Sequence, residues 1–216
     1  MQNRLRFANL PQIYADARLN TLRTDCYKTP ESKAVFISAC KAIKYWLDNL
    51  EEMEKRGMGL YFFSNTKGSG KTRVVASLAN ELMKEKNIPV KFATSMQILD
   101  EIKATWDRQS GEYTSEHKLI DALSTARILI IDDFGTEKVK DWMSEKFYSI
   151  INGRYIDNKV TIFTSNLSLN DLRYDDRIMN RIKERVYMIP FPEESVREHI
   201  ANNNAKELWQ KSNENI

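Results

Sequence analysis

The chain has 216 residues, of which 42% are hydrophobic and 29% are charged, and its formal net charge is +3. That length suits a single α/β domain with its own core. No apolar stretch approaches the roughly 20 residues that cross a membrane, and no apolar segment of a secretory signal follows Arg4 and Arg6. We therefore expect a soluble, cytoplasmic protein. The small net charge does not by itself argue for nucleic-acid binding.

The N-terminal part of the chain predicts a lead-in followed by one helix. Residues 1–28 show no sustained period and are expected to pack against the core. Thr29 as N-cap and Pro30 in the first turn then begin a helix, whose apolar residues continue at helical spacing to Gly57. Cys40 lies on this apolar stripe, which favours a buried free thiol. The two cysteines and two histidines are too scattered for a zinc site.

From Gly59 onward, short apolar runs alternate with amphipathic helices, a pattern typical of a parallel sheet covered on both faces. The predicted strands are 60–63, 90–93, 128–131, 160–164 and 186–189. Two helices between them are marked by Val74, Val75, Leu78 and Leu82, and by Ile98, Leu99, Ile102 and Trp106. The second helix begins with a capping box from Thr94 to Gln97. The expected fold is a five-stranded parallel α/β sheet flanked by helices.

A loop suited to phosphate lies between the first of these strands and the helix that follows it. It reads Asn65-Thr66-Lys67-Gly68-Ser69-Gly70-Lys71-Thr72. Successive backbone N–H groups that lead into a helix N-terminus hold phosphate oxygens, and the two glycines let the backbone approach them. Lys71 supplies charge to the β- and γ-phosphates, and the Thr72 hydroxyl is placed to ligate Mg²⁺. We expect ATP and Mg²⁺ as cofactors, with Arg73 also near the nucleotide.

The first position of this loop departs from the usual pattern, which begins with Gly. Asn65 stands there instead. Because Asn tolerates the left-handed conformation better than most residues, we expect the turn to be kept in that conformation.

Two further strands end in polar residues that complete a catalytic site. Asp132 and Asp133 follow the buried strand 128–131. Two adjacent carboxylates at the end of a strand are costly to hold together unless a cation binds them in a polar crevice. We expect Asp132 to hold the Mg²⁺ shell and Asp133 to orient the attacking water and accept its proton. Asn166, after strand 160–164, could contact the γ-phosphate, although an Asn at a strand end is more often a turn residue.

Arginines recur every four residues between the predicted strands 160–164 and 186–189. They are Arg173, Arg177, Arg181 and Arg185, and residues 177–184 are predicted to be helical. Two interpretations stay open, a solvated helix face and a surface for a partner that carries phosphate.

The ordered set of motifs resembles the DnaC/DnaI-type bacterial helicase loaders, which are AAA+ ATPases, and their close relatives, the IstB-like transposition ATPases. The motifs are the loop ending Gly68-Ser69-Gly70-Lys71-Thr72, then Asp132-Asp133-Phe134-Gly135, Thr164-Ser165-Asn166 and Ile178-Met179-Asn180-Arg181. The resemblance implies that Asn166 is the sensor 1 residue. It also implies that Arg181 is an arginine finger donated to the ATP of a neighbouring subunit, with Arg177 as the reserve candidate.

The same resemblance implies the organisation of the chain. Residues 191–197 look like the sensor 2 segment, which makes Arg197 a phosphate contact within its own subunit, and the single helix that fits after Pro192 predicts a minimal lid. The expected single AAA+ domain comprises a lead-in and helix (1–57), a P-loop core (58–190) and the lid (191–216). Loaders of this type often carry a separate N-terminal helicase-binding domain. Here that contact falls to the lead-in, or the chain is a fragment, or the protein works differently.

The function implied is ATP-dependent assembly of a homo-oligomer that delivers a replicative DNA helicase to single-stranded DNA. The alternatives are a transposition helper acting with a transposase, a P-loop small-molecule kinase, and a nucleotide switch with little turnover. Asp133 is one methylene shorter than the Glu common in AAA+ motors, which predicts slow hydrolysis. In the segment 95–127, Lys103, Trp106 and Arg108 offer charge and a stacking surface to single-stranded DNA. An ordinary amphipathic helix with Trp106 in the core is an equal alternative.

Overall fold

A computed structural model describes residues 10–106, 112–136 and 139–213. Its centre is a sheet of five parallel strands in the order β2-β3-β4-β1-β5. The strands are β1 (Gly59–Phe63), β2 (Val90–Thr94), β3 (Ile128–Asp132), β4 (Val160–Ser165) and β5 (Val186–Pro190). The predicted five-stranded parallel sheet is confirmed, and each strand differs from its predicted bounds by at most one residue at either end.

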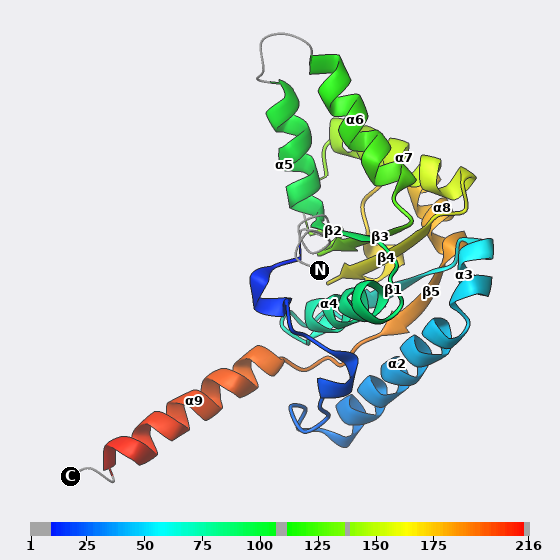
Figure 1. The fold of residues 1–216 in the computed structure, drawn as a ribbon. Helices are drawn as coiled ribbons and strands as arrows, with labels where there is room; N and C mark the ends of the chain where they lie inside the picture. The colour runs from blue at the N-terminus through cyan, green and yellow to red at the C-terminus, as the bar shows by residue number, and fades with distance from the viewer. Residues whose placement is uncertain (1–9, 107–111, 137–138, 214–216) are drawn as a thin grey trace.

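Helices cover both faces of the sheet (Figure 1). One face carries α2 (Pro30–Asp48), α3 (Leu50–Arg56) and α4 (Lys71–Asn80), and α4 continues into a π-helical turn, η3 (Glu81–Glu85). The other carries α5 (Ser95–Trp106), α6 (Glu112–Thr125), α7 (Asp141–Ile156) and α8 (Asp176–Arg185). Alternate residues of each strand enter the two cores, as Ile130 and Ile131 do in β3. This two-sided burial produces the continuous apolar runs of the sequence.

The N-terminal helix is divided, contrary to the prediction of one helix up to Gly57. The Thr29 hydroxyl accepts the Ser32 N–H (3.1 Å), so the predicted N-cap is confirmed. The chain then leaves the α-helical conformation at Asn49 (φ −111°, ψ 25°). The Asn49 side-chain amide donates to the Tyr45 carbonyl (2.8 Å), which offers the backbone an alternative to continuing the helix. A left-handed Gly57 (φ 64°) ends α3.

The capping box that begins α5 is confirmed in both directions. The Gln97 N–H donates to the Thr94 hydroxyl (3.1 Å), and the Thr94 N–H donates to the Gln97 side-chain carbonyl (2.9 Å). The helices α6 and α7 were not marked by the sequence pattern. In α7 the reason is that apolar residues also occupy its outer faces, since Ile156 is 66% exposed while Phe147 is buried.

The lead-in packs against the core over its described part, as expected. It contains the short turns η1 (Gln12–Tyr14) and η2 (Leu19–Thr21), and Leu10, Leu19 and Leu22 contact the cluster under α2 and α4. Cys40 also contacts this cluster, but it is only half-buried rather than fully buried as predicted. Of the helices in the described ranges, none is long and apolar enough to span a membrane.

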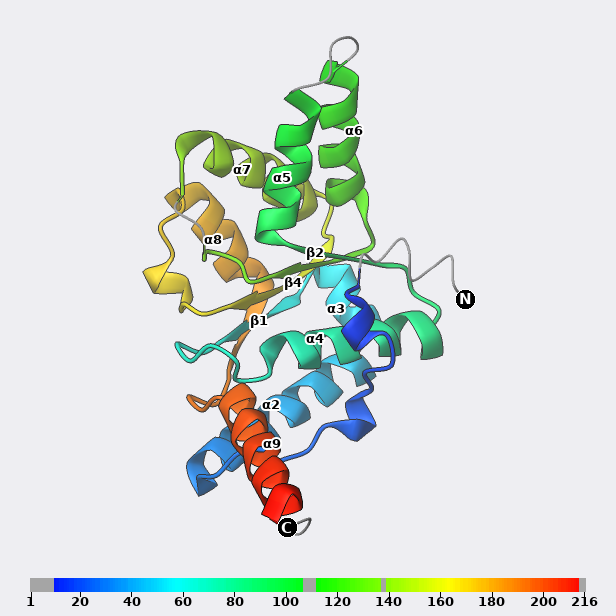
Figure 2. The ribbon, with the colours of Figure 1, turned by 90° about the vertical axis from the view of Figure 1, so that its left-hand side faces the viewer.

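One helix follows Pro192 in the described part of the chain, as predicted. This helix, α9 (Val196–Asn213), points away from the body of the molecule (Figures 1 and 2). Residues 201–210 are all exposed. The elements therefore follow the expected order of lead-in, core and C-terminal helix, and the division at residues 57 and 190 stays a prediction.

Candidate nucleotide-binding site

A cavity of about 480 Å³ lies at the carboxyl ends of β1, β3 and β4. Its walls include residues 67–73 of the predicted phosphate loop, together with Asp133, Asn166 and Arg197. Four segments far apart in the sequence thus meet at one point. The carboxyl edge of a parallel sheet is where α/β proteins place their ligands.

The two loop glycines have backbone conformations that other residues avoid. Gly68 has φ 78° and Gly70 has φ 100°. A Cβ at Gly68 would stand 3.0 Å from the Ser195 hydroxyl, and one at Gly70 would stand 3.2 Å from the Tyr27 hydroxyl. The backbone conformation therefore favours glycine at both positions, and a Cβ there would also crowd these two hydroxyls. Gly70 also precedes the first turn of α4, whose unpaired N–H groups favour an anion.

The start of the loop differs from expectation. Among the described non-glycine residues, positive φ occurs at Asn87, Asp133 and Asn158, so the left-handed turn expected at Asn65 is wrong. Of the described residues, those that line the cavity include neither Asn65 nor Thr66. An ordinary φ at the first position removes the need for glycine there, which explains physically why Asn is accepted.

Lys71 is held inside the curve of the loop. It is 5% exposed, and its ammonium donates to the carbonyls of Ser64 (3.3 Å) and Thr66 (3.2 Å) and to the Ser69 hydroxyl (3.2 Å). Burial lowers the pKa of Lys71, and the negative charge of Asp133 opposes that lowering. A cation is thus fixed at the floor of the loop.

Thr72 and Asp132 meet across the site. The Thr72 hydroxyl donates to Asp132 Oδ1 (3.1 Å), and the Thr164 hydroxyl of β4 donates to the same oxygen (2.5 Å). Asp132 is 3% exposed, and burial raises its pKa to about 6, although the Thr164 hydrogen bond acts against the rise. A hydroxyl beside a carboxylate is the kind of oxygen donor set that Mg²⁺ binds, so Thr72 and Asp132 fit a magnesium site.

Asp133 faces the cavity from a strained turn. It is exposed and has φ 53°, which costs a non-glycine residue on the order of 1 kcal/mol. The hydroxyls of Ser95 (2.9 Å) and Thr136 (3.0 Å) donate to its carbonyl. The next residue, Phe134, is buried and stacks on Tyr174 with ring centroids 4.7 Å apart. These contacts anchor the turn and direct the Asp133 carboxylate to the cavity.

The predicted arginine residues divide between two places. Arg197, in the first turn of α9, lines the cavity. Arg181 lies on α8, where its Nε donates to the Asn152 side chain (2.8 Å) and its guanidinium stands between the rings of Tyr148 (5.1 Å) and Tyr155 (5.5 Å). Arg177 lies beside it, ion-paired with Asp175 (2.9 Å). The three arginines of α8, Arg177, Arg181 and Arg185, therefore lie against tyrosine rings and outside the lining of the cavity of their own chain, whereas Arg173 precedes the helix.

Two of the three residues predicted to contact DNA, Lys103 and Trp106, lie on α5, which projects from the sheet together with α6 (Figures 1 and 2). Trp106 is 47% exposed, so the alternative that placed it in the core is wrong. Its ring meets Trp142 edge to face at 5.0 Å, and its Nε1 donates to Glu116 (2.7 Å). The Lys103 ammonium lies 5.4 Å from the Trp142 ring. Arg108 lies outside the described residues.

Several residues around the cavity escaped prediction. Ile13, Tyr14, Val196 and Ile200 add apolar walls to it. An adjoining cavity of about 420 Å³, lined partly by Tyr27 and Phe36, shares Val196 and Ile200 with it. No motif marks these positions, because they come from the lead-in and from α9, which approach the loop only in the folded chain.

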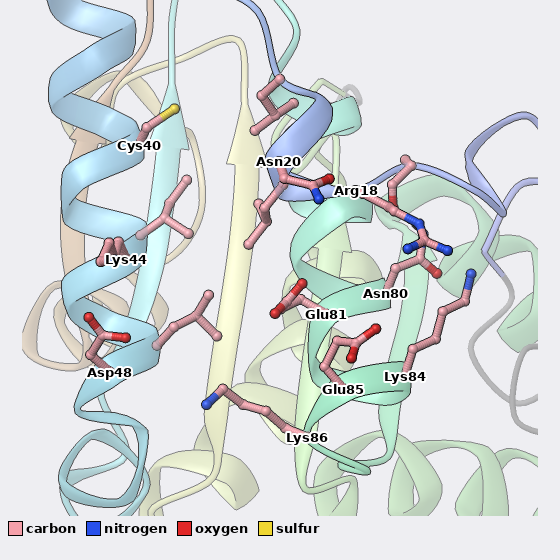
Figure 3. Close-up of a pocket in the computed structure, with 15 residues that line it drawn as sticks. Arg18, Asn20, Cys40, Lys44, Asp48, Asn80, Glu81, Lys84, Glu85 and Lys86 are labelled. Atoms are coloured by element: carbon pink, nitrogen blue, oxygen red, sulfur yellow. The ribbon is translucent and has the colours of Figure 1, made fainter.

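A larger cavity of about 760 Å³ lies between α2 and η3 (Figure 3). Its walls carry charges of both signs, including Lys44, Asp48, Glu81, Glu85 and Lys86. Among its lining residues there is no glycine-rich loop and none of the predicted site residues. Size alone therefore does not identify the nucleotide site.

The fold and the cavity define a P-loop nucleotide-binding protein of the AAA+ type. Residues 62–202, more than half of the chain, match the family of IstB-like ATP-binding proteins. The chain belongs to that family.

Relatives with curated names agree with this assignment. The chain is 29% identical over 123 residues to the phage-like element PBSX protein XkdC of Bacillus subtilis (strain 168), covering 54% of this chain and 44% of XkdC. It is 27% identical over 125 residues to the replicative helicase loader DnaC of Escherichia coli (strain K12), covering 57% of this chain and 49% of DnaC. The matches thus span about half the length of these relatives.

Solved structures share the fold. The crystal structure of the DnaC helicase loader superimposes with a TM-score of 0.69 at 23% identity, over 83% of this chain and 99% of that one. DnaI superimposes with a TM-score of 0.67 at 25% identity, over 83% and 93%. The replication initiator DnaA bound to AMPPCP and single-stranded DNA gives 0.64 at 17% identity, over 89% and 55%.

Proposed function

We propose that this protein binds ATP with Mg²⁺ and hydrolyses it slowly while loading or remodelling a replicative DNA helicase on single-stranded DNA. The observation that carries the proposal is the meeting of Lys71, Thr72 and Asp133 around one cavity, with Asp132 in contact with Thr72. Membership of a family of ATP-binding proteins supports the nucleotide. The similarity to DnaC supports the helicase.

Each group has a separate task in hydrolysis. The N–H groups of the loop and the Lys71 ammonium bind the phosphates, while Thr72 and Asp132 would hold the metal. Bound Mg²⁺ would neutralise charge on the transferred phosphoryl group. The Asp133 carboxylate orients a water towards the γ-phosphate and accepts its proton, with Asn166 contacting the same phosphate. The adenine ring of ATP would lie against the apolar side chains of Val196 and Ile200.

The proposal extends to assembly. Arg181 lies apart from its own cavity but is fixed on α8 by Asn152 and Tyr148, so it suits the ATP of a neighbouring copy. Arg177 is the second candidate. Single-stranded DNA would contact Lys103, Trp106 and Arg108, and the Trp142 ring adds a second aromatic surface beside Trp106.

Sizing the protein by sedimentation tests the proposal most directly. We expect a larger species with a non-hydrolysable ATP analogue, Mg²⁺ and single-stranded DNA, and no such species for Lys71→Ala or Arg181→Ala. An enzymatically active monomer indifferent to Arg181→Ala would instead support a small-molecule kinase.

The second candidate function is a transposition helper, favoured by the match to the IstB-like family. The tagged protein, incubated with ATP and either the host's replicative helicase or a transposase, separates the two. Capture of the helicase alone supports the first function, and capture of the transposase alone supports the second. Capture of neither removes both partner assignments.

A further inference from the structure

The segment between β5 and α9 is joined to the phosphate loop along its length. The Ser64 hydroxyl donates to the Pro192 carbonyl (2.9 Å), and the Val196 N–H donates to the Gly68 carbonyl (2.9 Å). These hydrogen bonds therefore hold the loop and the C-terminal segment against each other, although more than 120 residues separate Ser64 from Pro192.

Glu193 makes the most concentrated of these contacts. Its Oε1 accepts the Asn65 N–H (2.8 Å), and its Oε2 accepts both the N–H (2.8 Å) and the hydroxyl of Thr66 (2.8 Å). One carboxylate thus satisfies three donors on two consecutive residues. Partial burial raises the pKa of Glu193, but these hydrogen bonds outweigh it and the net pKa is lowered.

Thr66, which Glu193 holds by its N–H and hydroxyl groups, is also a partner of Lys71. The Thr66 carbonyl accepts a hydrogen bond from the Lys71 ammonium (3.2 Å). A carboxylate on one side of Thr66 and an ammonium on the other fix that residue from both directions. Lys71 is the predicted phosphate ligand, and Thr66 is one of the three residues whose oxygens fix the position of its ammonium.

We propose that Glu193 is a positioning residue of the nucleotide site, which holds the start of the phosphate loop so that Lys71 faces the phosphates. This inference rests on the proposed binding of ATP at the loop. The N–H groups that Glu193 occupies belong to residues outside the cavity lining, so it does not compete with the phosphates for them.

An opposing effect of Glu193 is electrostatic, because a carboxylate repels phosphate. Glu193 is exposed, so water and salt screen this repulsion. The hydrogen bonds, in contrast, act at contact distance and are strengthened by the charge. Positioning therefore outweighs repulsion, and loss of the carboxylate weakens nucleotide binding.

The test compares Glu193→Gln with Glu194→Gln. The adjacent Glu194 is a matched control, because its carboxylate accepts the N–H groups of Lys28 (2.6 Å) and Thr29 (3.4 Å), ahead of α2. Glutamine keeps the length of Glu193 but replaces one acceptor oxygen with an NH₂ group that faces a donor. We expect a fluorescent ATP analogue with Mg²⁺ to bind E193Q roughly tenfold more weakly and E194Q within about twofold of wild type. E194Q should also keep the turnover of wild type at saturating ATP, whereas E193Q should raise KM for ATP by a larger factor than it lowers kcat. The melting temperature of E193Q without nucleotide should stay near that of wild type, because Glu193 is exposed.

The inference would be overturned if E193Q bound the analogue as tightly as E194Q or more tightly. Tighter binding would mean that repulsion between the Glu193 carboxylate and the phosphates dominates. Should E193Q not fold, Thr66→Val removes one of the three donors and should weaken binding about threefold, and unchanged binding overturns the inference. Where E193Q and Thr66→Val both fold, the double variant should lose less binding free energy than the sum of the two single losses. Strict additivity of the two losses would argue against the inference. We expect Lys71→Ala not to bind the analogue. If the wild-type protein does not bind it either, the proposed function itself is overturned.

Discussion

At the residue scale, one hydroxyl organises the two acids that follow β3. Thr164, fully buried on β4, donates to Asp132 Oδ1 (2.5 Å) and accepts the Asp133 N–H (2.9 Å). It lies there because Ile131 and Phe163 are paired in the parallel register, which puts the next residues of both strands side by side. One side chain thus fixes both the predicted metal ligand and the backbone of the predicted base.

Thr164→Val should separate metal binding from nucleotide binding. The change removes the Thr164 hydroxyl from the partly buried Asp133 N–H and from the buried Asp132 carboxylate, which costs about 1–3 kcal/mol of folding stability. We expect the gain in ATP affinity on adding Mg²⁺ to fall roughly tenfold, while affinity in EDTA changes little. Thr164→Ser keeps the hydroxyl and should retain most of the gain. Isothermal titration with and without Mg²⁺ measures both, and equal losses in the two buffers would contradict the prediction.

Asp132 should make the metal-free protein less stable as pH rises. Its pKa in the folded state is about 6, above the usual 3.8, so the folded state binds a proton that the unfolded state has lost between these values. This contribution to stability is complete below about pH 4 and lost above about pH 6.

Asp132→Asn removes this pH dependence and can still accept both hydrogen bonds at Oδ1. In EDTA at pH 8, we expect it to be more stable than wild type by up to about 3 kcal/mol, with the difference vanishing near pH 4. Urea unfolding at the two pH values is the measurement. A variant less stable than wild type at pH 8 would show that burial of the charge is not the dominant effect.

Much of the site could be predicted because its functional side chains belong to residues that are consecutive in the sequence. Lys71 with Thr72, and Asp132 with Asp133, form such pairs. Glu193 could not be predicted, since its partners lie 127 and 128 residues away and no spacing reports that contact.

At the element scale, the strands were predictable because burial on both faces makes each one a continuous apolar run. The division between α2 and α3 was not, because the apolar stripe runs across it and Trp46, Leu50 and Met53 enter one core. Only the Asn49 side chain, turned back to the Tyr45 carbonyl, marks the break. Periodicity reports which face is buried, whereas a local side-chain hydrogen bond decides where a helix ends.

A buried arginine joins α6, α7 and β4. Arg154 is 1% exposed and donates to the carbonyls of Leu123 (2.7 Å) and Ala126 (2.8 Å) and to the Thr161 hydroxyl (2.8 Å). Burial lowers its pKa to about 9. Its described partners are hydroxyl and carbonyl oxygens, which include carbonyls at the C-terminal end of α6.

Arg154→Met should cost about 3 kcal/mol of unfolding free energy, because several buried carbonyls lose their donor together. ATP affinity should stay unchanged, as Arg154 does not line the nucleotide cavity. The control is Arg127→Met, which breaks an exposed ion pair with Glu54 and should cost no more than about 1 kcal/mol. Urea unfolding of both variants gives the comparison, and similar losses would refute the assigned role.

At the scale of the whole molecule, two cores enclose the sheet, and α9 contacts them only near its beginning over its described side chains. The last described contribution to either core from this end of the chain is Val196. Val196, Arg197 and Ile200 line the nucleotide cavity, whereas residues 201–210 are exposed. The beginning of α9 thus belongs to the site, and the exposed residues 201–210 belong to neither core.

Ending the chain after Asn203 should therefore leave the free energy of unfolding within about 0.5 kcal/mol of the full chain, as for changes at exposed positions. ATP affinity should also be kept, since the three lining residues remain. Ending it after Pro192 instead removes Glu193 and the lining residues, and should abolish binding while the cores persist. Urea unfolding and ATP titration of the two shortened chains test this. A marked loss of stability in the longer one would mean that the exposed part of α9 packs on the body in solution.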